Sequence, residues 1–337
     1  MREDEYSPQD RQRLARVRRN RKTHKAKDGK SRSQVRRNRN NPAQVPARLV
    51  RTSAFAPRRT HLSSDADFER IYIVPGHSVI RVKGRELGSQ HRDLIYNIFR
   101  VGKRCAVDTV VPDPEGPLPF RRIRQVPTTW RDLILAAGKT EHVNNVMSMH
   151  EIMSEFSQVL FDIYEGDQKQ IAEAIRARDW QKLRELSPSG SMRHLFETIE
   201  WEGLDLDSKV VITYGDWTID MIEMGKLVSL NSDVQNGLRS DYAKSIWPYI
   251  DSMTTHTYVD EPMLESLLGR DIWSDDETKT TRGQFRKDTK QAFEDMVRAG
   301  GLKSFRMEWH GKGHRKWKRY HYEPGLTQQT HQLELNM

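Results

Sequence analysis

The chain has 337 residues, with 56 lysines and arginines, 47 aspartates and glutamates, and a net charge of +9 at neutral pH. This length suits about two domains, and the single cysteine, Cys105, excludes an internal disulfide. No apolar run approaches the roughly 20 residues of a membrane span, and the N-terminus lacks the apolar core of a signal peptide. We therefore expect a protein of the cytoplasm, or of the nucleus if its host has one.

Charge is distributed unevenly along the chain. Residues 1–61 carry 19 basic and 5 acidic residues, residues 201–280 carry 6 and 16, and residues 281–322 carry 12 and 4. Clustered positive charge is typical of surfaces that bind phosphate. Residues 281–322 are therefore the first candidate for a nucleic-acid contact.

Residues 1–50 contain an arginine-rich run, RQRLARVRRNRKTHKAKDGKSRSQVRRNRNN, and no aromatic residue after Tyr6. Such a segment cannot bury enough apolar surface to offset the entropy lost on ordering, so we expect a disordered basic tail. Two roles stay open for it. One is a solubilising or targeting arm, and the other, favoured by the arginine content, is a non-specific nucleic-acid arm.

Residues 51–231 are predicted to form a first domain. Its elements in order are two strands at 70–84, a helix at 89–103, a proline-rich loop at 110–120, a short helix at 127–138, a helix running into a strand at 139–167, a helical insertion at about 169–191 and a strand hairpin at 197–222. Thr128 or Thr129 would cap the short helix, and Gly138 would end it.

Residues 232–326 are predicted to form a second domain, and residues 327–337 a C-terminal tail. Its elements are a helix at 240–253, a short helix at 259–269 with Asp260 as N-cap, a helix at 281–299 and a hairpin at 304–323. Both halves thus repeat the order of a winged helix-turn-helix. The predicted fold class is α+β, mainly helical, with two tandem winged helix-turn-helix domains.

The helix at 281–299 sorts its side chains by chemistry. At about 100° per residue, its apolar residues share one face, its cations one flank and its acids the other, with Glu294 as the exception. The apolar set is Phe285, Ala292, Phe293 and Met296, the cationic set is Arg286, Lys287 and Lys290, and the acidic set is Asp288 and Asp295. A recognition helix packs one face on its domain while the neighbouring flank enters the major groove.

These patterns predict DNA-binding residues in both domains. In the second domain they are Arg282, Arg286, Lys287 and Lys290 on the helix, and Lys312, His314, Arg315, Lys316, Lys318 and Arg319 on the hairpin. Arginine can bind guanine with two hydrogen bonds, whereas lysine more often contacts phosphate. A solvated charged face is the alternative. In the first domain, His142, Asn144 and Asn145 would read bases, or equally form a polar surface or a protein interface.

No arrangement of catalytic or cofactor-binding residues is visible in the sequence. It lacks paired cysteines and an HExxH motif for zinc, and the segment LILAAGKT (133–140) has leucine where a phosphate-binding loop requires glycine. We therefore expect no enzyme activity, no metal and no cofactor. A nickase or recombinase would need an ordered tyrosine or metal cluster that the sequence does not display.

Four segments together resemble plasmid replication initiators with two tandem winged-helix domains, of the TrfA type. VRTSAFAPRR (50–59) is similar to the entry to that family's first domain, and HSVIRVKGRELGSQHRDLIYNIF (77–99) to the strand and helix that follow. SDYAKSIWPYI (240–250) with FRKDTKQAFEDMVRAGGL (285–302) resembles its second domain, where a Phe-Arg helix enters DNA. The arginine-rich tail and residues 169–191 depart from the pattern.

The resemblance implies binding to direct repeats in double-stranded DNA at a replication origin, with recruitment of the host initiator and the replicative helicase. It also implies exchange between a homodimer and a DNA-binding monomer, and main contacts from Arg286, Lys287 and Lys290. HQLELNM (331–337) resembles peptides that bind the bacterial sliding clamp, with an ordinary frayed tail as the alternative. A winged-helix transcriptional regulator or partition factor stays open as a second function.

Overall fold

The computed structural model describes residues 42–50, 54–74, 78–113, 119–187, 190–223, 227–253, 257–269, 282–312 and 316–325. Of these, 43% lie in helices and 33% in strands, so the fold is mixed α/β and the predicted helical majority is not confirmed. The predicted C-terminal tail (327–337) and most of the predicted basic tail (1–41) lie outside the described residues. Within the described part, no helix has the length and apolarity to span a membrane.

The N-terminal part of the described chain is more ordered than its composition indicated. β1 (Ala43–Pro46) pairs antiparallel with β12 (Leu227–Leu230), and α3 (Ala47–Val50) follows it directly. The predicted disordered tail is therefore wrong for residues 43–50, where Ala43 and Val45 are fully buried in a strand that pairs with β12 and contacts α4. A short parallel pair, β2 (Phe55–Ala56) with β5 (Leu87–Gly88), forms a separate two-stranded sheet.

One four-stranded sheet of the first half carries the predicted insertion. Its order is β3 (Phe68–Val74), β4 (Ser78–Gly84), β8 (Leu160–Tyr164) and β9 (Gly190–Arg193). The helices predicted at about 169–191 are confirmed as α7 (Gln168–Arg176) and α8 (Trp180–Leu186), which form a small apolar cluster with Val79 of β4. That this segment is an insertion stays a prediction. The two strands at 70–84 are also confirmed.

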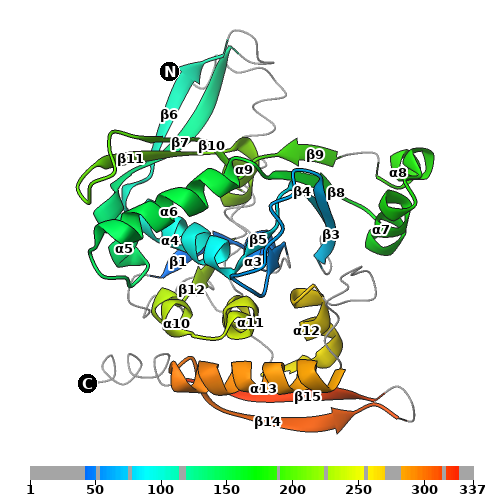
Figure 1. The fold of residues 1–337 in the computed structure, drawn as a ribbon. Coiled ribbons are helices and arrows are strands. Elements are labelled where there is room, and N and C mark those ends of the chain that lie inside the picture. The colour runs from blue at the N-terminus through cyan, green and yellow to red at the C-terminus, as the bar shows by residue number, and fades with distance from the viewer. Residues whose placement is uncertain are drawn as a thin grey trace, which may run out of the picture.

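A second four-stranded sheet has the order β10 (Phe196–Trp201), β11 (Lys209–Tyr214), β7 (Phe120–Thr129) and β6 (Val107–Pro112). The predicted proline-rich loop is wrong at both ends, because β6 and β7 extend into it as a hairpin that projects from the body (Figure 1). The predicted strand hairpin is confirmed for β10 and β11, but residues 216–222 lie in helix α9 (Asp216–Glu223).

Three helices pack on these sheets: α4 (Ser89–Cys105), α5 (Trp130–Ala136) and α6 (Val143–Phe156). Thr129 caps α5 as predicted, because its hydroxyl accepts a hydrogen bond from the Asp132 N–H. Trp130 is fully buried in the main apolar cluster of this half. If β6 and the interposed elements β8, α7, α8 and β9 are left out, the order along the chain is α4–β7–α5–α6–β10–β11, and β11 lies between β7 and β10 in the sheet.

The second half repeats this connectivity in a smaller form. Its elements are α10 (Ser232–Gly237), α11 (Asp241–Ser252), β13 (Tyr258–Asp260), α12 (Glu261–Leu267), α13 (Arg282–Arg298), β14 (Leu302–His310) and β15 (Trp317–Pro324). The sheet order is β13-β15-β14, so the third strand again lies in the middle. Its apolar side chains form a cluster separate from that of the first half. The number and bounds of the domains stay a prediction, which this repeated connectivity supports.

Candidate nucleic-acid interface

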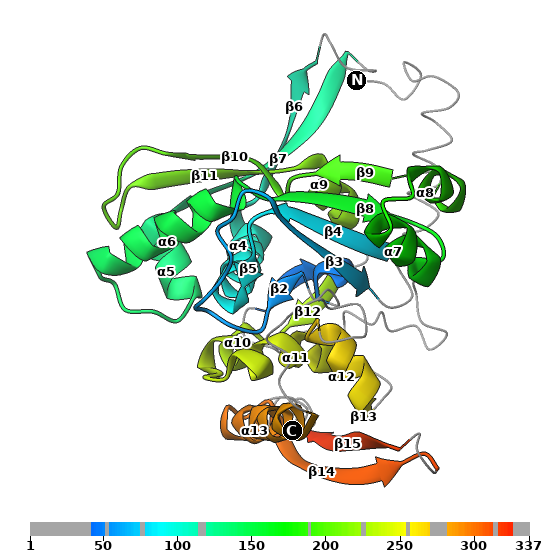
Figure 2. The same cartoon turned by 45° about the vertical axis from the view of Figure 1, so that its right-hand side comes forward.

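Helix α13 is anchored by the apolar face that its periodicity predicts. Phe285, Ala292, Phe293 and Met296 are all fully buried. The Phe293 ring stacks on Tyr320 of β15 with centroids 4.9 Å apart and lies 5.3 Å from Phe305 of β14. The helix and the hairpin therefore form one packed unit at one end of the molecule (Figure 2).

Arg286 is turned toward its own domain. Its Nε and Nη2 atoms donate to the two carboxylate oxygens of Glu261 in α12, at 2.6 and 2.9 Å. Its guanidinium also lies 4.8 Å from the ring centroid of Trp309 in β14. Arg286 thus connects α12, α13 and β14, and a base contact by this residue would require giving up the Glu261 pair.

Glu261 is a fully buried carboxylate at the centre of this contact. Besides Arg286 it accepts the backbone N–H of Lys318 at 2.8 Å, and the Nε of Arg282 lies 3.7 Å from it. Burial alone would raise the pKa of Glu261, but the hydrogen bonds from Arg286 and Lys318 outweigh it and hold that pKa below its usual range. We name Glu261, Arg286, Trp309 and Lys318 the brace.

The outward face of α13 carries the two lysines. Lys287 and Lys290 are exposed, and Lys290 lies 3.4 Å from Glu294 one turn along the helix. Gln284 and Gln291 are exposed on the same face, and the Gln284 amide donates to the Asp288 carboxylate at 2.7 Å. Glutamine can bind adenine with two hydrogen bonds. Sequence reasoning missed both glutamines because it followed charge alone, although the same helical count places them beside Lys287.

The hairpin cations divide in a similar way. Lys312 and Lys316 are exposed beside the hairpin tip, whereas His314 and Arg315 lie outside the described residues. The Lys318 ammonium lies 5.2 Å from the Trp309 ring centroid. Arg319 lies on the other face of the strand, and the predicted DNA-binding set is therefore not one continuous surface.

Arg319 instead fixes the start of α12. Its guanidinium donates to both oxygens of Asp260, at 2.7 and 2.9 Å, and lies over the Tyr258 ring. Hydrogen bonds from Arg319 hold the pKa of Asp260 below its usual range. Asp260 occupies the N-cap position as predicted, but makes no side-chain cap because its carboxylate is taken by Arg319.

The candidates of the first domain lie on α6, away from α13 in both views (Figures 1 and 2). The His142 Nδ1 atom accepts the Asn144 N–H at 3.1 Å, which caps the helix, and the Asn145 amide donates to the Thr140 carbonyl at 2.7 Å. The exposed neighbours include the apolar residues Val143 and Met147. The start of α6 therefore exposes a mixture of uncharged polar and apolar side chains and is not a basic surface.

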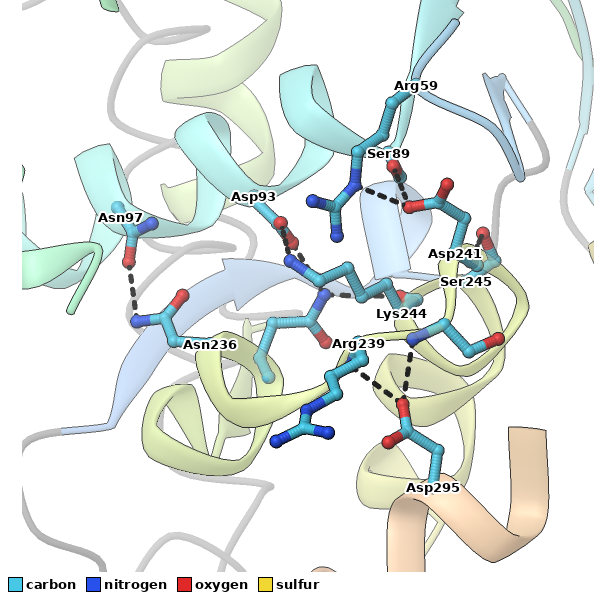
Figure 3. Close-up of polar contacts among 12 residues, drawn as sticks. Arg59, Ser89, Asp93, Asn97, Asn236, Arg239, Asp241, Lys244, Ser245 and Asp295 are labelled. Atoms are coloured by element: carbon cyan, nitrogen blue, oxygen red, sulfur yellow. Dashed lines mark hydrogen bonds and ion pairs between the residues drawn. The ribbon is translucent and has the colours of Figure 1, made fainter. Parts of the chain in front are cut away.

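Asp295, on the acidic flank of α13, makes contacts within the protein. Its Oδ2 atom accepts the backbone N–H groups of Arg239 and Ser240 at 2.7 and 2.8 Å (Figure 3). Burial opposes ionisation, but these hydrogen bonds and Arg298 leave the pKa of Asp295 below its usual range. The carboxylate that the sequence places opposite the cations therefore ties α13 to the turn before α11.

Polar side chains join the second half to α4 and its flanks (Figure 3). The buried Lys244 ammonium contacts the Asp93 carboxylate, which also accepts the Gln235 amide at 2.8 Å. Asp241 accepts hydrogen bonds from Arg59 and Ser89, both at 2.7 Å. Hydrogen-bonded pairs thus connect α11, on which α13 packs, to the first half. Within the described residues, no group of three or more potential metal ligands is present.

Comparison with solved structures assigns the fold. Domains 2 and 3 of RctB, as a selenomethionine derivative, align with a TM-score of 0.51 at 10% identity, over 83% of this chain and 98% of that one. The chain has a Rep-type initiator fold. At this identity the likeness shows the fold alone, and it agrees with the predicted winged-helix class.

Two further Rep-type structures align less well. A second structure of RctB domains 2 and 3 gives a TM-score of 0.45 at 12% identity, over 82% of this chain and 96% of that one. The Pi initiator protein in complex with iteron DNA gives 0.44 at 14% identity, over 71% and 92%. No protein-family model and no curated protein matches the sequence.

Proposed function

We propose that this chain initiates DNA replication by binding repeated duplex sites at an origin through α13 and the hairpin β14–β15. The observation that carries the proposal is the outward face of α13. It presents Lys287 and Lys290 beside the exposed hairpin residues Lys312 and Lys316, on a helix whose opposite face is fully buried. The Rep-type initiator fold supports this reading of the surface.

In the proposed complex, α13 lies in the major groove and the hairpin crosses the adjacent backbone. Lys287 and Lys290 supply phosphate or base contacts, and Gln291 faces an adenine edge, whereas Gln284 would first have to give up its hydrogen bond to Asp288. Arg286 does not read bases in this arrangement. It holds the hairpin against α12 and α13, so that the two contacting elements approach DNA as one rigid piece.

As an initiator, the chain would act together with proteins of a bacterial host. The chain would act in the bacterial cytoplasm, on a plasmid, phage or chromosomal origin, and would recruit the host initiator, the replicative helicase and the sliding clamp. A homodimer that gives way to a DNA-binding monomer is part of the same proposal. It includes no catalytic step, so magnesium and supercoiled DNA should yield no nicked product, and clean strand cleavage would refute that part.

The decisive experiment is origin cloning. The gene with its flanking DNA should sustain a plasmid that has no other origin, whereas a transcriptional regulator or partition factor would fail. The double variant Lys287→Ala/Lys290→Ala should abolish replication. The matched control, Lys169→Ala/Lys182→Ala, removes two exposed lysines from the insertion and should replicate normally.

A further inference from the structure

Trp309 is an exposed aromatic side chain at the edge of the candidate interface. It lies on β14, the edge strand of the β13-β15-β14 sheet, and is 57% exposed. Phe305, Met307 and Trp309 alternate along β14 and therefore share one face. Phe305 packs on Phe293 of α13, and Met307 is half-buried against the same cluster. Trp309 continues this apolar row beyond the part that the core covers.

Two cations contact the Trp309 ring and restrict its orientation. The Arg286 guanidinium lies 4.8 Å and the Lys318 ammonium 5.2 Å from its centroid. Arg286 is in turn held by two hydrogen bonds to the buried Glu261. Cation–π contacts of this kind favour a face of the ring against each cation. The indole is therefore pre-organised, and its ordering entropy is lost on folding rather than on binding.

Exposed lysines near Trp309 would bind the phosphates of a DNA backbone beside it. Lys312 and Lys316 are exposed further along the same hairpin, and Lys287 lies on the outward face of the neighbouring helix. DNA held by these lysines would pass the edge strand on which Trp309 sits. Many proteins that kink DNA insert an apolar side chain between two neighbouring base pairs, while nearby cations bind the phosphate backbone.

We propose that Trp309 is a wedge that enters the minor groove beside the α13 site and separates two neighbouring base pairs. The inference rests on the proposed function and adds a second contact with a defined effect, local unstacking and bending of the duplex. Pyrimidine–purine steps such as TA unstack at least cost, so the wedge selects a flexible step at a fixed distance from the α13 contact.

The experiment uses the full chain and a duplex that this chain selects from a random pool. Permanganate, which oxidises unstacked thymines, and energy transfer between dyes on the duplex ends report unstacking and bending. The wild type should expose one thymine step and bend the duplex. Trp309→Ala should lose both signals and bind about tenfold more weakly, while Trp309→Leu should retain both because leucine also serves as a wedge.

Trp180→Ala is the matched control, because Trp180 is 53% exposed and lies under the Arg81 guanidinium, far from α13 in sequence. It should behave as the wild type. The inference is overturned if wild type and Trp309→Ala give equal permanganate and bending signals while Lys287→Ala still weakens binding. If the wild type selects no sequence at all, the proposed function fails, and the wedge fails with it.

Discussion

Replacing Glu261 by glutamine tests whether the brace holds the hairpin and α13 together. The substitution keeps the size of the side chain and removes its charge. In the wild type, the two carboxylate oxygens accept two hydrogen bonds from Arg286 and one from the Lys318 backbone. Glutamine has only one acceptor oxygen. Its NH₂ group, itself a donor, would face an N–H donor of Arg286 or Lys318, so at least one hydrogen bond would be lost.

The expected cost follows from these contacts. Hydrogen bonds that involve a charged group contribute about 1.5 to 3 kcal/mol each, and breaking a buried ion pair costs about 3 to 5 kcal/mol. The Arg286 side chain is 23% exposed, so water compensates in part. We therefore expect the free energy of unfolding to fall by about 2 to 4 kcal/mol at pH 7.

Chemical denaturation of the full chain at several pH values measures the effect. Because the pKa of Glu261 is lower in the folded chain than in the unfolded one, its stabilisation is present above the unfolded value of about 4.3 and is lost as the pH falls through the folded value. The difference between wild type and Glu261→Gln should therefore shrink below about pH 4. Glu265→Gln, on the same helix, is the control, and equal stabilities of the two variants at pH 7 would refute the brace.

Three further outcomes are expected. Lys287→Ala/Lys290→Ala should weaken DNA binding and reduce the slope of log affinity against log salt by about 2 if both lysines contact phosphate, as measured by titration at several salt concentrations. Asp93→Asn should lower the free energy of unfolding by about 3 kcal/mol, because it leaves the buried Lys244 ammonium without its carboxylate. Gly84→Ala should cost more than about 2 kcal/mol in the same assay, because Gly84 has φ +103° and an added Cβ would lie 1.9 Å from a backbone oxygen.

Local periodicity correctly predicted the features that depend on residues close together in the sequence. The apolar face of α13 and the Thr129 cap were found because both depend on residues within a few positions in sequence. The same count placed Asp295 opposite the cations, and in the structure its carboxylate accepts the backbone N–H of Ser240, the residue before α11. Patterns of this kind determine which side of a helix faces the core.

Elements that depend on distant partners were missed. β1 directly follows the arginine-rich segment, and it is buried because β12 pairs with it and α4 packs on it. The prolines in and around β6 and β7 indicated a loop. Apolar residues of these strands such as Val110 and Phe120 are exposed, so they do not follow the pattern of a core-facing strand. Arg286 was assigned outward because its partner, Glu261, lies 25 residues earlier on another helix. No local rule reports a contact of that kind.

The division of the α13 cations has a consequence for the DNA sequence recognised. With Arg286 engaged by Glu261 and Gln284 by Asp288, the outward face of α13 offers Lys287, Lys290 and Gln291. Arginine supplies the commonest two-bond contact to guanine, whereas glutamine suits adenine and lysine suits phosphate. Duplexes selected from a random pool should therefore carry adenine or thymine pairs opposite α13. An invariant guanine there, lost from the selected sites when Arg286→Ala is used, would show that Arg286 leaves Glu261 on binding and that the brace is a contact of the free protein only.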